Sequence, residues 1–267
     1  MKFNHIYNED NIDTLKRLED NTIDLVITSP PYDAIRKYNG FAFDIDELTK
    51  QLFSKMSIGG IVVWVVNDQV INGSETGTSF KQALKFMEAG FKLHDTMIYQ
   101  KNSSTYPSSR KGNRYTQIFE YMFVFSKGKP RVSNLICDKA NKWAGHTNWG
   151  KNTKRIGKNE ELVEVKKIKP VPDFSPRNNI WTYNNGGGFA STDKIAYKHP
   201  AIFPEELVKD HLITWSNEGD LVYDPFMGSG TVAKVCILNN RRYLGSEISK
   251  EYIEIAKERI ENVVINI

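Results

Sequence analysis

The stretch LVYDPFMGSGTVAKVCIL, residues 221 to 238, joins an apolar run typical of a buried strand to an apolar run typical of a helix. The connecting string DPFMGSGT, Asp224 to Thr231, contains two glycines, which let backbone N–H groups approach a ligand at the helix N-terminus. Glu247 stands 23 residues after Asp224, at the end of the next predicted strand, where an acidic side chain commonly accepts hydrogen bonds from ribose hydroxyls. The unit therefore predicts a site for a nucleoside-bearing cofactor, with a plain strand-to-helix turn as the alternative. No Lys-Ser or Lys-Thr follows the glycines, which excludes a Walker-type phosphate loop.

Strand and helix patterns alternate on both sides of this string, which favours a doubly wound α/β fold with a mainly parallel sheet. Apolar runs predict strands at residues 3–7, 23–28, 61–66, 93–100, 119–126, 220–223 and 241–248. Helical spacing of apolar residues appears at residues 12–18, 45–56, 80–87, 204–215, 232–238 and 252–260. Two of the strands, 93–100 and 119–126, are expected to pair antiparallel, and Gly59-Gly60 is expected to end the second helix.

The middle of the chain differs from both ends. From about residue 127 to 198 the periodicity fades into a polar stretch rich in Lys, Asn and Gly. Between Lys101 and Lys169 there are 16 Lys or Arg against 5 Asp or Glu, a net charge of +11, whereas the rest of the chain carries −7. A basic segment interleaved with Asn, Ser, Trp and Tyr predicts a polyanionic partner such as nucleic acid. A solvated Lys-rich loop is the alternative.

Composition excludes several classes of protein. With 267 residues, 40% hydrophobic and 25% charged, the chain resembles a globular protein that can bury a core. The N-terminal sequence has no apolar signal region and no stretch approaches roughly 18 apolar residues, so secretion and membrane spanning are not expected. Cys137 and Cys236 form no spaced pair, which suits a reducing cytosol, and the five histidines lack ligand spacing. We therefore expect a cytoplasmic protein without a metal site.

A second motif, TSPPY at residues 28–32, ends the predicted strand 23–28. Together with DPFMGSGT it resembles the S-adenosylmethionine-dependent DNA amino-methyltransferases, which methylate N4 of cytosine or N6 of adenine. The catalytic motif comes early and the cofactor motif late, with a recognition region between them, which is the order of the family's β group. Other similar segments are YNEDNIDTLKRL, GGIVVWVVND, EYMFVFSKG and HPAIFPEEL. The opening carries Glu9-Asp10 where the family usually has Gly-Asp.

The resemblance implies a class I methyltransferase fold, which is Rossmann-like, circularly permuted and built on a seven-stranded, mostly parallel sheet. It divides the chain into a catalytic half (1–128), a loop-rich target-recognition region (129–198) and a cofactor-binding half (199–267). The strand at 220–223 should then lie beside the strand at 23–28. Ligands bind beyond the carboxyl ends of such strands, so the two motifs should face each other there.

The resemblance and the charge pattern together give a set of expected site residues. The catalytic residues are Ser29, Pro30, Pro31 and Tyr32. The residues for the cofactor, S-adenosyl-L-methionine, are Asp10, Phe203, Asp224, Pro225, Phe226, Gly228, Ser229, Gly230, Thr231 and Glu247. The candidate contacts to double-stranded DNA are Arg110, Lys111, Arg114, Arg131, Lys154 and Arg155. A companion restriction endonuclease and a bacterial, archaeal or phage origin are also implied.

The catalytic motif has a physical rationale. An exocyclic amine is a poor nucleophile, because its lone pair is delocalised into the ring. Acceptors at the Ser29 hydroxyl and the Pro30 carbonyl would draw the amine toward tetrahedral geometry and aim its lone pair at the methyl group. The prolines fix φ and remove competing N–H donors, and Tyr32 offers a ring on which a flipped base can stack.

The base and the nucleic acid are less closely defined. Serine in the first motif position occurs mainly in the N4-cytosine branch and aspartate among adenine enzymes, so N4 of cytosine is expected and N6 of adenine is the alternative. Methylation at cytosine C5 is excluded because no cysteine stands in a Pro-Cys context. An RNA methyltransferase and an inactive DNA-binding relic are the further alternatives.

Overall fold

The computed structural model describes residues 1–31, 43–102, 113–147, 153–156, 161–164, 169–184 and 190–265. The described chain forms two compact units, one of Met1–Asn134 with Asn179–Ile267 and one of Leu135–Asn178. No helix among the described residues is long and apolar enough to cross a membrane.

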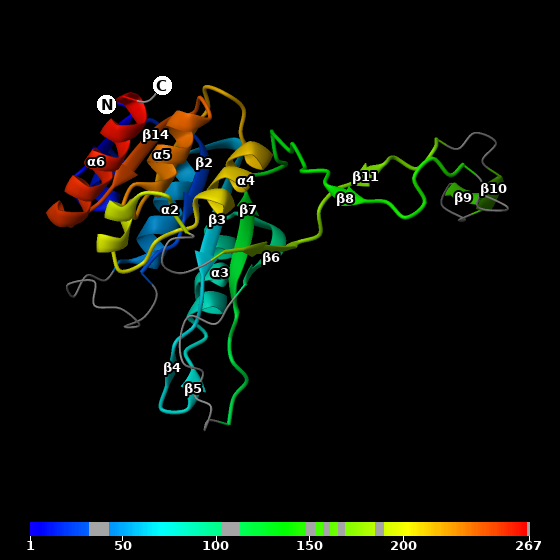
Figure 1. Ribbon diagram of the computed structural model, residues 1–267, viewed down its shortest axis with the longest axis horizontal. Helices are drawn as coiled ribbons and strands as arrows, with labels where there is room; N and C mark the ends of the chain where they lie inside the picture. Colours follow the sequence, from blue (N-terminus) through cyan, green and yellow to red (C-terminus); the bar gives the residue numbers. More distant parts are fainter. Residues whose placement is uncertain are drawn as a thin grey trace. The chain divides into compact units, whose positions relative to one another are not determined.

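An eight-stranded sheet forms the centre of the larger unit, in the order β1-β14-β13-β2-β3-β7-β6-β12 (Figure 1). Its strands are β1 (His5–Tyr7), β2 (Ile23–Thr28), β3 (Met56–Val66), β6 (Lys92–Lys101), β7 (Phe119–Ser126), β12 (Ile180–Tyr183), β13 (Leu221–Asp224) and β14 (Arg242–Ser246). Within this sheet β7 is antiparallel to both of its neighbours, and every other pairing is parallel. The mainly parallel doubly wound fold and the antiparallel pair β6–β7 are therefore confirmed.

The sheet differs from expectation in its strand count. We expected seven strands, and β12 adds the eighth by pairing parallel to β6 at the edge of the sheet. Its residues alternate between exposed and buried, with Trp181 and Tyr183 facing the core. The strand has four residues inside a polar segment, so its period-2 pattern was too short to be recognised.

β13 lies directly beside β2, with Val222 opposite Leu25 and Tyr223 opposite Val26. This confirms the predicted adjacency of two strands that are separated by almost the whole chain. Because β2, β13, β14 and β3 are all parallel, their carboxyl ends share one edge of the sheet, which we call the carboxyl edge.

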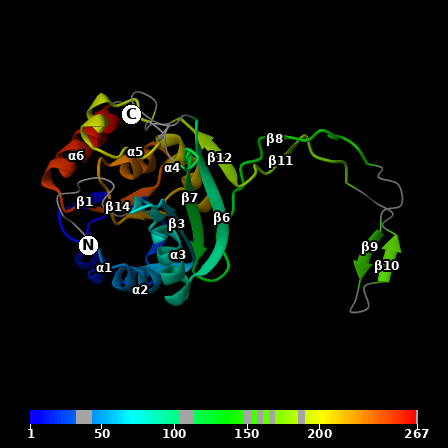
Figure 2. The same ribbon diagram turned by 90° about the horizontal axis from the view of Figure 1, so that it is seen from below.

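Helices cover both faces of the sheet (Figure 2). Helices α1 (Asn11–Lys16), α2 (Ile45–Lys55) and α3 (Thr78–Glu88) pack on one face, over a core that includes Trp64, Phe86 and Phe125. Helices α4 (Glu205–Trp215), α5 (Thr231–Leu238) and α6 (Lys250–Ile265) pack on the other face. A 3-10 helix, η1 (Lys194–Lys198), contacts α6.

Two short stretches depart from the predicted element bounds. Gly59 and Gly60, expected to end the second helix, lie inside β3, because the helix already ends at Lys55 and the strand starts at Met56. A hairpin of β4 (Val70–Ile71) and β5 (Ser74–Glu75) follows β3 at the carboxyl edge.

The smaller unit consists of short antiparallel pairs. β8 (Lys139–Ala140) pairs with β11 (Phe174–Ser175), and β9 (Thr153–Ile156) pairs with β10 (Glu161–Glu164). Arg177 supports the first pair through its ion pair with Asp138 at 2.5 Å.

Candidate cofactor and catalytic site

The two sequence motifs meet at the carboxyl edge. β2 ends at Thr28 and leads into Ser29-Pro30-Pro31, whereas β13 ends at Asp224 and leads into the glycine loop. The Thr28 hydroxyl donates a hydrogen bond of 2.7 Å to Asp224 Oδ1. The structure therefore joins the catalytic motif to the cofactor motif through a direct contact between the last residues of two neighbouring strands.

Asp224 is the buried acid of this edge, with 4% of its surface exposed. Its Oδ1 also accepts the N–H of Phe226 at 2.9 Å. Burial raises the pKa of Asp224 to about 7, and the charge of Glu247 acts in the same direction, while the bonds from Thr28 and Phe226 oppose the rise. Near neutral pH this carboxyl can therefore respond to a charged ligand by changing its protonation.

Glu247 follows β14, and its carboxylate lies against the glycine loop at Gly228. Its Oε2 accepts the N–H of Gly228 and its Oε1 accepts the N–H of Ser249, each at 2.8 Å. Burial raises the pKa of the Glu247 carboxyl above its usual value. A carboxylate has about four lone-pair sites, so acceptor capacity remains for ribose hydroxyls.

The glycine loop adopts conformations that require glycine at two positions. Gly228 has φ of 52°, and a Cβ there would lie 3.0 Å from His199 Nε2. Gly230 has φ of 79°, and a Cβ there would lie 2.8 Å from Ala256 Cβ. Both the left-handed backbone and the close neighbours therefore exclude larger side chains.

Asp10 and Asn11 stand at the start of α1, far from the cofactor motif in the sequence, and the fold brings Asn11 against that motif. Asp10 is exposed and caps the helix, accepting the N–H of Ile12 at 2.8 Å. Asn11, which the sequence did not single out, is 5% exposed, and its Nδ2 lies 3.5 Å from the Pro225 carbonyl oxygen. Asn11 Oδ1 has no hydrogen-bond partner among the described residues. An orphaned acceptor beside Pro225 fits a ligand that carries an N–H or O–H donor.

The structure describes the catalytic motif as far as Pro31. Ser29 and Pro31 are half-buried and Pro30 is buried. The Ser29 hydroxyl forms no hydrogen bond within the described part of the chain, so its lone pairs are available to an incoming amine. Tyr32, the fourth predicted catalytic residue, lies outside the described residues.

The two predicted aromatic contacts pack within the protein. The Phe226 ring lies 4.8 Å from that of Phe43 and 6.2 Å from that of Trp64, measured between centroids. Phe203 packs against the core under α4 and α5. Both side chains are half-buried.

Ser229 and Thr231 are buried, and each hydroxyl accepts a hydrogen bond from Arg259, at 3.1 and 3.0 Å. The side chains of these two predicted cofactor residues therefore face α6. Arg259 itself was not found from the sequence, because nothing in its local pattern marks a buried arginine.

The predicted DNA contacts are dispersed. Arg110 and Lys111 lie outside the described residues, while Lys154 and Arg155 are in β9 of the smaller unit. Arg114 donates a hydrogen bond to the Gly73 carbonyl in the β4–β5 hairpin. Arg131 hydrogen-bonds Asp24 at 3.0 Å and Asp220 at 2.9 Å, at the starts of β2 and β13, so it lies at the edge of the sheet opposite the motifs.

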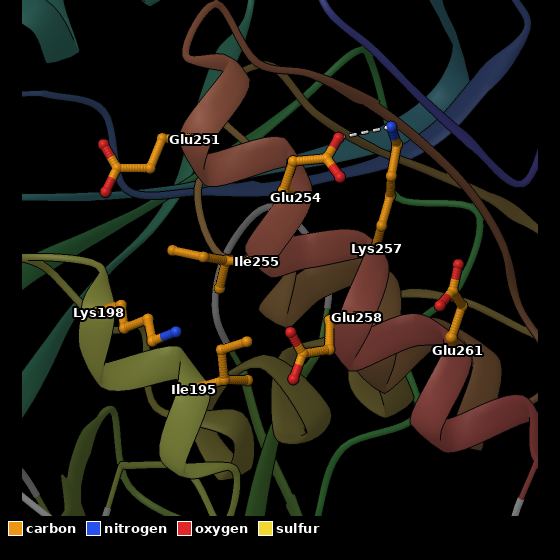
Figure 3. A pocket seen from close by; sticks show the side chains of 8 residues that line it. All are labelled: Ile195, Lys198, Glu251, Glu254, Ile255, Lys257, Glu258 and Glu261. Carbon is orange, nitrogen blue, oxygen red and sulfur yellow. Dashed lines mark hydrogen bonds and ion pairs between the residues drawn. The ribbon is translucent and has the colours of Figure 1, made fainter.

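A surface groove lies away from the motifs, between η1 and α6 (Figure 3). Its lining residues are Ile195, Lys198, Glu251, Glu254, Ile255, Lys257, Glu258 and Glu261. None of them belongs to the predicted site, and four glutamates make the groove a poor surface for a polyanion.

Three comparisons place this geometry among known proteins. A DNA methylase family model, N6_N4_Mtase, matches residues 23–258. The orphan methyltransferase M.BamHII of Bacillus amyloliquefaciens is 53% identical over 250 residues, covering 94% of this chain and 93% of that protein. The type II methyltransferase M.HpaI of Haemophilus parainfluenzae is 30% identical over 256 residues, covering 94% and 72%. The fold resembles the solved PvuII DNA methyltransferase (cytosine-N4-specific), with a TM-score of 0.71, 19% identity, and coverage of 97% of this chain and 89% of that one.

Proposed function

The chain belongs to the N6/N4 DNA methylase family, and from that premise we propose that it methylates N4 of a cytosine flipped out of duplex DNA, with S-adenosyl-L-methionine as the methyl donor. The observation that carries this proposal is the 2.7 Å bond between Thr28 and Asp224, because it joins the motif proposed to bind the base to the motif proposed to bind the cofactor. Methyl transfer requires both ligands to meet at one point, and this edge supplies that point.

The residues present fit the cofactor. The Glu247 carboxylate retains acceptor capacity for ribose hydroxyls, and the orphaned Asn11 Oδ1 supplies an acceptor for the amine of adenine. Asp224, ionised in part near neutral pH, suits the positive charge that the donor carries. Asp10, Phe203, Pro225 and Phe226 complete the proposed wall of the site. When bound, the cofactor supplies an electrophilic methyl group on a sulfonium.

Catalysis in this proposal is positioning. The Ser29 hydroxyl and the Pro30 carbonyl accept the two hydrogens of the exocyclic amine and direct its lone pair to the methyl carbon. The bound cofactor would supply the methyl group and leave as S-adenosylhomocysteine, and the amine would release one proton to solvent. Pro31 fixes the backbone behind these acceptors, and Tyr32 stacks on the flipped base.

Cytosine is favoured over adenine by Ser29. A neutral hydroxyl accepts one amine hydrogen without the charge that an aspartate would bring. The PvuII DNA methyltransferase, which is cytosine-N4-specific, shares this fold. N6 of adenine is the second candidate.

Recognition of duplex DNA is proposed for residues 129–198, with Lys154 and Arg155 of β9 on phosphates. Arg110, Lys111 and Arg114 are also proposed to contact DNA. Arg131 is also proposed as a DNA contact, although its guanidinium pairs with two carboxylates at the opposite edge of the sheet. A restriction endonuclease as companion is a separate proposal, and the name of M.BamHII, an orphan methyltransferase, favours a protein that works without one.

The test is to identify the modified base. The protein is incubated with methyl-labelled S-adenosylmethionine and unmethylated genomic DNA, and the digested nucleosides are separated by mass. We expect N4-methylcytosine. N6-methyladenine would overturn the base assignment and leave the mechanism intact, whereas 5-methylcytosine, or label in RNA competitor alone, would overturn the proposed chemistry or substrate.

A further inference from the structure

A buried cluster of charges lies behind the cofactor loop. Arg259 of α6 is 1% exposed, although arginine is rarely buried so completely. Its Nε donates to Asp193 Oδ2 at 2.9 Å and its Nη2 donates to Glu205 Oε1 at 2.7 Å. Lys234 of α5 bonds the same two carboxylates at 2.8 and 3.0 Å. Two cations therefore balance two anions.

Nη2 of Arg259 also donates to the Ser191 hydroxyl at 3.2 Å, and Nη1 donates to the cofactor loop. Nη1 donates to the Ser229 carbonyl oxygen at 2.7 Å, to the Ser229 hydroxyl at 3.1 Å and to the Thr231 hydroxyl at 3.0 Å. One planar guanidinium thus holds Ser229 by its carbonyl oxygen and its hydroxyl. The Ser229 N–H forms no hydrogen bond within the described part of the chain, so it is free to meet a ligand.

The same cluster fixes a second wall of the site. Glu205 starts α4, and Asp193 precedes η1, the 3-10 helix that leads to His199. The His199 ring lies close to Gly228, because a Cβ built on that glycine would be 3.0 Å from His199 Nε2. The segment from Asp193 to Glu205 and the glycine loop are therefore held in one arrangement by shared partners.

A buried ion cluster is weak evidence that its residues stabilise the fold, because apolar residues of similar volume often give the same stability. One use of such clusters is to specify a single geometry. Here the geometry specified is that of the glycine loop. We propose that Arg259 is a positioning residue for the cofactor, which holds Ser229 by its carbonyl and hydroxyl oxygens so that the unbonded Ser229 N–H faces the ligand. This inference rests on the proposed function, because it takes S-adenosylmethionine as that ligand.

The variant Arg259→Lys separates positioning from charge balance. Lysine keeps the positive charge near Asp193 and Glu205, so the cluster stays neutral, but an ammonium cannot repeat the fork that reaches Ser229 and Thr231. A matched control is Val263→Ala, which removes packing from a buried position of the same helix without touching the loop. A second variant, Asp193→Asn, loosens Arg259 from outside the loop.

Two readouts are needed, and the first does not involve the cofactor. Hydrogen exchange of the ligand-free protein should show faster exchange of the Gly228 and Gly230 amides in Arg259→Lys, with the amides of β13 unchanged. Titration calorimetry should then show a Kd for S-adenosylmethionine raised about tenfold or more, as for the loss of roughly one well-placed interaction. At saturating cofactor, kcat and the KM for DNA should stay close to wild type. Asp193→Asn should shift both readouts in the same direction, and Val263→Ala neither.

Unchanged loop exchange and a wild-type Kd in Arg259→Lys would overturn the positioning role, as would an equal weakening in Val263→Ala, which would make the effect one of general stability. If Arg259→Lys does not fold, the positioning role is tested with Asp193→Asn, using the same loop exchange and the same Kd measurement. A wild-type protein that binds no S-adenosylmethionine would instead overturn the proposed function, and this inference with it.

Discussion

Thr28 donates its hydroxyl hydrogen to the buried carboxylate of Asp224 at 2.7 Å, although 196 positions separate the two residues along the chain. Each residue ends a strand, and each is followed at once by one of the two motifs. The bond therefore couples the direction of Ser29-Pro30-Pro31 to the protonation of the acid that begins the cofactor motif. Four predictions follow from this edge and from the core beneath it.

Thr28→Val should weaken cofactor binding more than it weakens the fold. The Thr28 bond lowers the pKa of Asp224, so its loss should raise that pKa further and move the pH at which S-adenosylmethionine binds half-maximally upward. The lost bond to a buried acid should cost about 1.5–3 kcal/mol of stability. Calorimetric titrations between pH 6 and pH 9 measure the shift. Thr214→Val is the control, because Thr214 is equally buried but bonds the backbone of its own helix; an equal shift there would contradict the coupling.

Asp224→Asn should stabilise the protein at high pH while abolishing tight cofactor binding. The pKa of Asp224 rises from 3.8 to about 7 on folding, so in this window the native state holds a proton that the unfolded state has released. The contribution of Asp224 to stability should accordingly fall as pH rises from about 4 to 7, by up to about 1.4 kcal/mol per pH unit. Asparagine should lack that slope, as measured by urea unfolding at a series of pH values. An Asp224→Asn protein that is less stable than wild type at pH 8 would contradict the assigned pKa.

His211→Leu should remove a slope of opposite sign. His211 is fully buried, its Nδ1 has no partner among the described residues, and burial lowers its pKa from 6.5 to about 3. The unfolded state therefore binds a proton that the native state excludes, and stability falls as pH drops below about 6.5. Between pH 4 and pH 6.5 this slope opposes that of Asp224, so wild type should vary little there. His211→Leu should lose stability with rising pH across that range, and a flat profile in the variant would count against the neutral buried imidazole.

Ser29→Ala should separate catalysis from binding. Since the Ser29 hydroxyl has no partner within the described residues, its removal should leave the fold and the Kd for S-adenosylmethionine close to wild type, while kcat falls by about 10² or more. Glu247→Ala should show the reverse pattern, a raised Kd from the lost acceptor. Rapid-quench measurement of one turnover distinguishes the chemical step from product release. Near-normal turnover in Ser29→Ala would show that the hydroxyl is not an acceptor in the transition state.

The sequence by itself determined the local chemistry of this protein. The order of residues in DPFMGSGT and in SPPY fixes which backbone conformations are open to those turns, because Gly and Pro act through their own φ angles and not through distant contacts. Gly228 and Gly230 take positive φ as such a loop requires. Apolar periodicity likewise predicted the mainly parallel sheet, and the resemblance to the DNA amino-methyltransferases, carried by the two motifs, implied that β13 would lie beside β2.

Only the tertiary structure decided the partners of the charged and polar side chains. Lys and Arg look alike in a sequence whether they face solvent, DNA or a buried carboxylate, so Arg131 was expected at DNA and lies between Asp24 and Asp220. Nothing in the sequence of its helix predicted that Arg259 is buried, yet its guanidinium hydrogen-bonds Ser229, Asp193 and Glu205. Asn11 and Pro225 are 214 positions apart in the sequence, yet the Asn11 amide lies beside the Pro225 carbonyl oxygen. Periodicity reports that a position is buried, but the energy of a buried polar group depends on which atom stands opposite, and chain folding alone brings that atom there.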